Sequence, residues 1–502
     1  MGRSRMRTGI LPGAGLGPAD VEIELKFIVP ATARAALVRR LGTASARSLP
    51  LRAAYFDTAD DRLAAAGLAL RVRREGRRWV QTLKGRGDGL LQRAEHEVPL
   101  PAQRGVPLPD PARHAGSAPG AALAEQLADG AALVERYRTD VRRLSRVVRH
   151  AGARIEVAYD EGRIVAGERH VAVCELEFEL LSGPTPALID LAARWVAQFG
   201  LRLDVTTKSE RGLLLARGVA APVVRARPSR VVPGMTPASA FAAMVGDALA
   251  QVLPNAAACA GAEGGAEALH QLRVGLRRLR SVLHAGVDWS SDPAAARALA
   301  QALRAPFARL GAQRDDDAMR AWLAPALAEA GAPPLDWPAA APAGDSAAEL
   351  NTPAFSALML EALRLASQTG TPGAALDDAA RAWQRRAERR VVAAVRDLDL
   401  ADDAALHRLR KRLKRLRYVL EALQPVLPRK RTARVLRALQ RALEALGRCH
   451  DEAVAQSIWR THVEAEPRGW FVVGWLAARR PRSLRRAERC LGDLTRAISQ
   501  RR

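Results

Sequence analysis

The sequence contains few aromatic residues, few cysteines and no long apolar run. Aromatics make up 4% of the 502 residues, so there is little material for stacking nucleic-acid bases. The four cysteines form no C-x-x-C pair, which leaves a zinc or dithiol redox motif without support. No stretch of about 18 apolar residues occurs, and we therefore expect no membrane span. Walker A, G-x-S-x-G and H-E-x-x-H motifs are also missing, so three common classes of hydrolase are not indicated.

Positive charge, in contrast, is abundant. Lys and Arg number 78 against 53 Asp and Glu, a formal net charge of +25. Such an excess predicts a polyanionic partner, which is nucleic acid, anionic lipid or polyphosphate. Residues 1–20 are basic and then rich in Gly and Pro, without an apolar core, so we interpret them as a disordered tail and not a signal peptide. The predicted absence of a signal peptide and the small number of cysteines together favour a cytoplasmic location. Polyphosphate granules are a further location that the sequence allows.

The stretch from Val21 to Phe27 alternates polar and apolar residues, which is the period of a β-strand. Glu22, Glu24 and Lys26 therefore share one face, and the apolar residues share the other. Two carboxylates and an ammonium are costly to bury without charged partners, of which divalent metal and phosphate are the natural ones. A solvated strand face is the alternative, and this strand alone does not decide between the two.

Later segments repeat this design and sort their charges by sign. The pattern predicts strands that carry Arg71 with Arg73, Thr82 with Lys84, and Arg93 with Glu95 and Glu97. Further on, one predicted strand carries Arg143, and another places three acids on one face: Glu175, Glu177 and Glu179. Closing such a sheet into a barrel would line its interior with both signs of charge. A tunnel of this kind could hold a linear phosphate chain with its metal ions.

The ordered series of motifs resembles the CYTH, or triphosphate tunnel metalloenzyme, superfamily over about residues 20–217. The resemblance is carried by Glu-x-Glu-x-Lys at 22–26, by residues 55–58, 69–73, 81–84 and 175–179, and by Lys208 with Arg211. It implies hydrolysis of inorganic triphosphate or a related triphosphate with Mg²⁺ or Mn²⁺. The implied metal ligands are Glu22, Glu24, Glu175 and Glu177, and the implied catalytic group is Glu22, Glu24 and Lys26. The implied substrate-binding residues are Lys26, Arg71, Arg73, Lys84, Arg93, Arg143 and Lys208. Glu95, Glu156 and Asp160 are interpreted as acids that support the ligands or the fold.

Residues 218–235 are proline-rich and aperiodic, and a helical pattern with an internal repeat begins at 236. Leucines at 269, 272, 276, 279 and 283 return 137 residues later at 406, 409, 413, 416 and 420. Each set forms one apolar stripe on a helix. Beside each apolar stripe runs a basic stripe, free of the acids that a solvated face would intersperse. The two basic stripes are His270, Arg273, Arg277 and Arg280, and His407, Arg410, Lys414 and Arg417.

A second repeated element, Leu-Gly at 310 and at 446, leads to Asp315 and Asp451, which we interpret as helix caps or partners of a buried arginine. Residues 236–502 resemble the CHAD domain, a helical domain with two related halves. That family is associated with binding inorganic polyphosphate, which makes both basic stripes the implied polyphosphate-binding residues.

The sequence thus predicts an α+β chain: an N-terminal antiparallel β-barrel or tunnel domain followed by an all-α helical domain with two related halves. The expected divisions are a tail at 1–20, the CYTH domain at 21–217, a linker at 218–235 and the CHAD domain at 236–502. Three alternatives stay open: a non-catalytic polyphosphate-binding or granule-associated protein, a class IV-like adenylate cyclase or thiamine triphosphatase, and nucleic-acid binding through charge alone. We expect no specific nucleic-acid partner.

Overall fold

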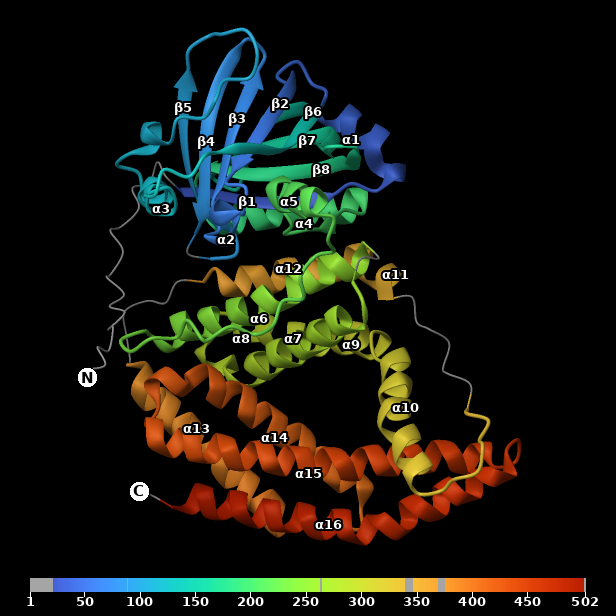
Figure 1. The fold of residues 1–502 in the computed structure, drawn as a ribbon. Helices are drawn as coiled ribbons and strands as arrows, with labels where there is room; N and C mark the ends of the chain where they lie inside the picture. Colours follow the sequence, from blue (N-terminus) through green and yellow to red (C-terminus); the bar gives the residue numbers. More distant parts are fainter. Residues whose placement is uncertain (1–20, 88, 262–263, 339–345, 369–374, 501–502) are drawn as a thin grey trace, which may run out of the picture. The chain divides into compact units, whose positions relative to one another are not determined.

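The computed structural model describes residues 21–87, 89–261, 264–338, 346–368 and 375–500, and the side chains of 312–318 are not described. The tail expected at 1–20 and the side chain of Asp315 lie outside the described part. The chain divides into two compact units, Met1–Ala220 and Ala221–Arg502, and the division falls within the residues expected as a linker. Each unit is described by itself below (Figure 1).

The first unit is a closed antiparallel barrel of eight strands. Their order is β5-β4-β3-β2-β6-β7-β8-β1, and β1 also pairs with β5, which closes the ring. A two-residue strand, β9 (Arg202–Leu203), adds to β1. The barrel strands are β1 (Val21–Ile28), β2 (Arg47–Asp57), β3 (Ala69–Glu75), β4 (Arg78–Arg86), β5 (Gln92–Leu100), β6 (Val134–His150), β7 (Ala153–Ala166) and β8 (Arg169–Ser182).

The outer face of the barrel is covered by apolar packing. Helix α4 (Thr185–Phe199) lays Trp195 edge-on against Phe178, which in turn packs edge-on against Phe27. A 3₁₀ turn at Ala31–Ala33 leads into α1 (Arg34–Leu41). The remaining short helices of this unit are α2 (Arg62–Ala65) and α3 (Ala118–Gln126). Because apolar side chains occupy the outside, the charged positions of β1, β3 and β8 face inward.

Helix α5 (Lys208–Arg217) packs on β6, β7 and β8 through Leu213 and Leu215, which join an apolar cluster around Tyr137. A capping box between Thr207 and Glu210 fixes the start of this helix. Gly212 allows the close approach, because a Cβ atom there would lie 2.2 Å from the Tyr137 ring. The first turn of α5 is thereby held firmly beside the barrel strands.

The second unit is built from helices whose leucine stripes are buried. All five leucines of the second stripe are buried on α14, and the first stripe is buried on α7 except for Leu269, which is half-buried. Helix α7 packs against α6 and α14, and α15 packs against α14 and α16. The helices are α6 (Pro237–Ala260), α7 (Ala266–Ala285), α8 (Pro293–Ala302), α9 (Arg304–Arg309), α10 (Ala312–Glu329), α11 (Ser346–Leu350), α12 (Pro353–Ala366), α13 (Leu376–Arg396), α14 (Asp403–Leu423), α15 (Arg429–His462) and α16 (Trp470–Ser499).

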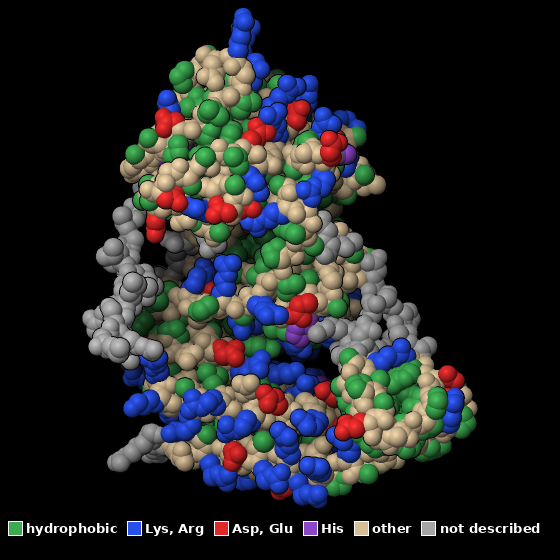
Figure 2. All heavy atoms as spheres, in the orientation of Figure 1, with side chains coloured by type: hydrophobic (Ala, Val, Ile, Leu, Met, Phe, Trp, Pro, Cys, Tyr) green, Lys and Arg blue, Asp and Glu red, His purple; other side chains and the backbone are tan. Residues whose placement is uncertain are grey.

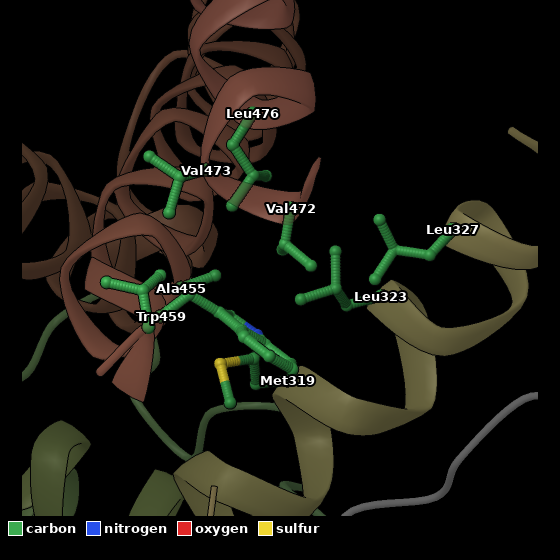
Figure 3. Packing of buried hydrophobic residues seen from close by; sticks show 9 residues of the cluster. Met319, Leu323, Leu327, Ala455, Trp459, Val472, Val473 and Leu476 are labelled. Carbon is green, nitrogen blue, oxygen red and sulfur yellow. The ribbon is translucent and has the colours of Figure 1, made fainter. Parts of the chain in front are cut away.

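A separate apolar cluster holds α10 to the ends of α15 and α16. Trp459 is fully buried between Met319 and Leu323 of α10 and Val472 of α16 (Figure 3). Within the described residues, no helix combines the length and the apolar character needed to cross a membrane.

Replacing Gly212 with alanine should destabilise the first unit by about 1–3 kcal/mol, because the added methyl group overlaps the Tyr137 ring. Thermal unfolding followed by circular dichroism measures this effect. Gly474→Ala is the matched control, since no atom lies within 4 Å of its added Cβ and alanine favours a helix. Equal melting temperatures for Gly212→Ala and the wild type would contradict the tight packing of α5.

Candidate functional site

The strand register brings charged side chains of both signs together inside the barrel. Glu22 lies opposite Arg93 at the closure of β1 and β5, and Lys26 lies opposite Glu177 across β1 and β8. Arg143 lies opposite Asp160 across β6 and β7. Directly opposed residues in neighbouring strands have adjacent side chains, so each of these positions meets a charge of opposite sign. The sequence predicted a charged interior, and the strand register shows which oppositely charged residues lie next to each other.

One group of ions surrounds Lys84. Its Nζ lies 2.5 Å from Glu22 Oε2 and 3.0 Å from Glu95 Oε2, and Glu95 also lies 3.5 Å from an Arg71 nitrogen. Glu24 forms an ion pair with Arg93, with 3.2 Å between Oε1 and Nε. Close by, Arg73 pairs with two acids, Glu75 and Glu97. The side chains of Glu22 and Arg73 are 12% and 15% exposed, so both are shielded from open solvent.

A second group contains three carboxylates that converge. Asp160, Glu175 and Glu177 have oxygens within 4.8 Å of one another, and the first two side chains are fully buried. Arg143 donates two hydrogen bonds of 2.7 Å to Asp160 and a third to Glu177. From α5, Lys208 contacts all three carboxylates, and Arg211 contacts Glu175. Buried carboxylates at this spacing require cations, which these three basic residues supply.

Burial raises the pKa values of Glu22 and Glu24, and the charge of Lys84 opposes this rise. Burial acts on Glu177 in the same direction, but Lys208 and Arg143 outweigh it and hold the pKa of Glu177 well below its usual value. Glu177 therefore stays ionised as a ligand or ion partner at neutral pH.

Lys26 is the exception among the barrel cations. Its side chain is buried, and its Nζ donates no hydrogen bond to any residue that the structure describes. Burial lowers the pKa of Lys26, although the carboxylates of Glu175 and Asp204 partly oppose the shift. A buried donor without an acceptor is expensive, which indicates that an anionic group belongs beside it.

The three converging carboxylates fit a divalent metal. Hard cations prefer carboxylate oxygens, and Mg²⁺ is commonly held by only a few of them together with phosphate. Oε1 of Glu175 is buried and touches Lys208 but accepts no hydrogen bond of good geometry, so this oxygen lacks a fully satisfactory partner. Asp160, Glu175 and Glu177 are accordingly the residues that would hold the metal.

The structure places the sequence-predicted acidic residues in two groups. Glu175 and Glu177 join Asp160, whereas Glu22 and Glu24 contact Lys84 and Arg93. Glu24 is still near enough to Glu177 for their charges to repel. Sequence reasoning gave Asp160 only a supporting role and gave Arg211 none. Arg211 had a usable signal, because three residues after Lys208 is the same face of a helix.

The basic stripes of the second unit lie on α7 and α14, which pack against each other. Burial and the nearby charges of Arg410 and Arg277 lower the pKa of Lys414 to about 7, so Arg277 of α7 and Lys414 of α14 lie close together. Phe307 of α9 lies under three guanidinium groups, those of Arg273, Arg277 and Arg280, at 5.8, 6.0 and 5.6 Å from its ring centre.

Several of these cations form no ion pair. Arg277, Arg280 and Lys414 form none with another described residue, although the nearby carboxylate of Asp451 partly opposes the lowering of the Lys414 pKa. His407 stacks on His450 with ring centres 4.6 Å apart, and burial together with neighbouring cations lowers the pKa of His407 to about 4. One face of this unit shows many more Lys and Arg side chains than acids (Figure 2). The charge pattern is that of an anion-binding surface.

The first unit is therefore a tunnel-like barrel with an ionic interior, and the second is a helical unit with clustered cations. Two family models match the chain, the CYTH domain over residues 20–213 and the CHAD domain over residues 243–460. The protein thus consists of a CYTH domain followed by a CHAD domain, as the sequence motifs predicted.

Named relatives match individual parts of the chain. An inorganic triphosphatase of Haemophilus influenzae is 32% identical over 164 residues, which are 32% of this chain and 44% of that protein, so the match spans less than half of the relative. Among solved structures, the CHAD domain of the plant Ricinus communis is 27% identical, covers 56% of this chain and 98% of that one, and has a TM-score of 0.45. A Hippeastrum protein named as an adenylyl cyclase, with a dominant triphosphatase activity, is 18% identical over 40% of this chain and 98% of that one, with a TM-score of 0.28.

Glu179 should make the barrel less stable as the pH rises. Burial and the charges of Glu22 and Glu156 raise the pKa of Glu179 to about 7, above the ordinary value of 4.5. The unfolded chain therefore loses this proton first, and the stabilisation present below pH 4.5 is lost between pH 4.5 and 7. Glu179→Gln should melt higher than the wild type at pH 8 and nearly equally at pH 4.5.

Melting curves over this pH range measure the difference. Glu168→Gln, at an exposed turn, is the control and should follow the wild type. Parallel curves for Glu179→Gln and the wild type would show that Glu179 does not titrate with folding.

Proposed function

We propose that the CYTH domain hydrolyses inorganic triphosphate or a related triphosphate with the help of Mg²⁺ or Mn²⁺. The observation that carries the proposal is the group of three converging carboxylates, Asp160, Glu175 and Glu177, beside buried cations in a closed barrel. The curated relative named inorganic triphosphatase supports the same reaction. A hydrolase of this kind needs both metal ligands and phosphate ligands in one enclosed space, and the barrel interior has both types of residue.

The cations of the barrel would bind and orient the phosphate chain. Arginine offers paired donors to phosphate oxygens, and Arg71, Arg73, Arg93 and Arg143 have this capacity. Lys84 and Lys208 would add point charges, and Lys26 has an Nζ that needs an acceptor. These groups stabilise charge on the phosphoryl oxygens as the bond to the leaving phosphate breaks. The metal, when bound, supplies Lewis-acid activation of a phosphoryl oxygen or of water.

The carboxylates of the barrel would have two different roles. Asp160, Glu175 and Glu177 would hold the metal. Glu22 and Glu24 keep Lys84 and Arg93 in position, and Glu24 borders the metal-binding group through its proximity to Glu177. In this arrangement Glu22 and Glu24 orient the phosphate ligands, and Glu24 is the better placed of the two to approach the metal.

We also propose that the CHAD domain binds polyphosphate through the basic stripes of α7 and α14. The supporting observation is a set of cations that form no ion pair among the described residues: Arg277 and Arg280, which lie over the ring of Phe307, and Lys414, which lies near Arg277. A linear polyanion can satisfy successive cations along two adjacent helices. Because few aromatics are available for base stacking, polyphosphate should bind in preference to single-stranded DNA at physiological salt.

Replacing Asp160 with Asn should lower kcat/KM for triphosphate by at least about 100-fold, because a buried ligand and its charge are lost together. Phosphate release with Mn²⁺ or Mg²⁺ measures the effect, with ATP and thiamine triphosphate tested in parallel. Glu161→Gln is the matched control, since Glu161 is the next residue on the same strand and its exposed side chain pairs outside with Arg34. Wild-type protein that releases phosphate from none of these substrates would refute hydrolysis.

The double variant Arg277→Gln/Lys414→Gln should bind long-chain polyphosphate about 10- to 100-fold more weakly, because two charge-assisted contacts are removed. Fluorescence competition at 150 mM salt, an ionic strength with a Debye length of about 8 Å, measures the affinity. Arg381→Gln/Arg396→Gln removes the same charge from α13, where both arginines already pair with acids, and should bind normally. Equal weakening by both double variants would indicate that net charge alone governs binding.

A further inference from the structure

Lys208 occupies the point at which the three converging carboxylates meet. Its Nζ lies 2.7 Å from Asp160 Oδ2 and 2.8 Å from Glu177 Oε1, and it also touches Glu175 Oε1. Arg143 reaches two of these carboxylates and Arg211 reaches one, so among the described residues only Lys208 contacts all three. The ammonium group therefore stands where a cation shared by the three acids would have to lie.

The local charges are already balanced without a metal. Three carboxylates face three direct basic partners, Arg143, Lys208 and Arg211. A divalent cation bound to the three carboxylates would give this buried group a net positive charge. It would also lie within contact distance of the Lys208 ammonium group. Like charges at such a distance repel strongly where water is excluded. Either the added cation stays out or one of the basic groups withdraws.

Lys208 is the group best able to withdraw. It is the first residue of α5, and its charge sits at the end of a flexible four-carbon stem. Arg143 is fixed by two parallel hydrogen bonds to Asp160. The capping box at Thr207 and Glu210 holds the helix itself, so the lysine side chain can rotate without any displacement of α5.

We propose that Lys208 is a placeholder for the metal: it neutralises Asp160, Glu175 and Glu177 in the ligand-free tunnel and transfers to a phosphate oxygen when metal and triphosphate bind. This inference rests on the proposed function of the CYTH domain and deepens it. The exchange breaks three ion contacts of the ammonium with carboxylates and replaces them with contacts to phosphate oxygens. No covalent bond changes.

The exchange couples the two ligands. Without triphosphate, Lys208 competes with the metal for the same oxygens, so metal binding is weakened. With triphosphate present, the ammonium has another anion to contact, and the competition is relieved. Linkage requires the effect to be mutual, so the metal must strengthen triphosphate binding by the same factor. Lys208 would thereby keep the tunnel from holding a metal that has no substrate to act on.

The test is the affinity for Mn²⁺ alone, measured by titration calorimetry and by the electron paramagnetic resonance of free Mn²⁺. Lys208→Met should bind Mn²⁺ about 5- to 150-fold more tightly than the wild type in the absence of triphosphate. A lysine that only supported the site would give the opposite result, because its removal would disorder the carboxylates. Lys208→Gln is the second variant, used if the methionine variant does not fold.

Lys84→Met is the matched control. It removes the same charge from the same tunnel, but Lys84 contacts Glu22 and Glu95 and none of the three converging carboxylates. A tighter Mn²⁺ complex for Lys208→Met alone supports the placeholder. Unchanged or weaker binding by Lys208→Met overturns it, and so does an equal gain in both lysine variants, which would reflect net charge.

The readout separates this inference from the hydrolysis itself. A wild type that fails to release phosphate, together with tighter Mn²⁺ binding by Lys208→Met, would refute hydrolysis and leave the placeholder supported. If the wild type is active but Lys208→Met gains no Mn²⁺ affinity, hydrolysis is supported and the placeholder role of Lys208 is refuted. The effect of added triphosphate on Mn²⁺ affinity should also be smaller in Lys208→Met than in the wild type, and an undiminished effect counts against the exchange.

Discussion

The barrel depends on the pairing of buried carboxylates with buried cations. Asp160 and Glu175 are fully buried, and each would carry a large desolvation penalty if its basic partners were removed. Such a network is not an efficient way to stabilise a fold, because apolar side chains of similar size often do as well or better. Its presence throughout the interior is therefore better explained by binding than by stability. The ions hold one another in place until a more highly charged ligand and its metal exchange partners with them.

The architecture around the network follows from this need. Strand β1 pairs with β8 along one half and with β5 along the other, which removes the open edges and shields the interior from water. Apolar residues on the outer face, such as Phe27 and Phe178, pack beneath α4 and fix the strands. Helix α5 packs on the same strand faces that carry Arg143 and Asp160, through Leu213 and Leu215, and so brings Lys208 and Arg211 to the carboxylates. Under the proposed exchange, rigid strands and a flexible lysine side chain would let the ion partners change without unfolding.

The sequence was sufficient to predict which residues share one face of a strand or helix. Alternation alone placed Glu22, Glu24 and Lys26 on one face, and helical spacing placed the leucine stripes of α7 and α14 in the core. What it could not supply was the register between strands far apart in the chain. The register sets Lys26, not Glu24, opposite Glu177, and it sets Asp160 opposite Glu175. For that reason the sequence could name Glu22, Glu24, Glu175 and Glu177 as metal candidates but could not show that they lie in two ion groups or that Asp160 joins the second.

The two domains have opposite electrostatic arrangements, although phosphate chains are the proposed ligand of both. In the barrel each direct cation of the metal-binding group is already neutralised, so binding must exchange one set of contacts for another, and the enclosed site is little affected by dissolved salt. On α7 and α14, Arg277, Arg280 and Lys414 form no ion pair among the described residues, and the two arginines lie over the ring of Phe307. Such a surface attracts any polyanion at long range and weakens steeply as salt rises, because bound counterions are released. Under the proposed functions, the helical arrangement would favour capture of long chains, whereas the barrel arrangement would select a short phosphate chain that binds together with a metal.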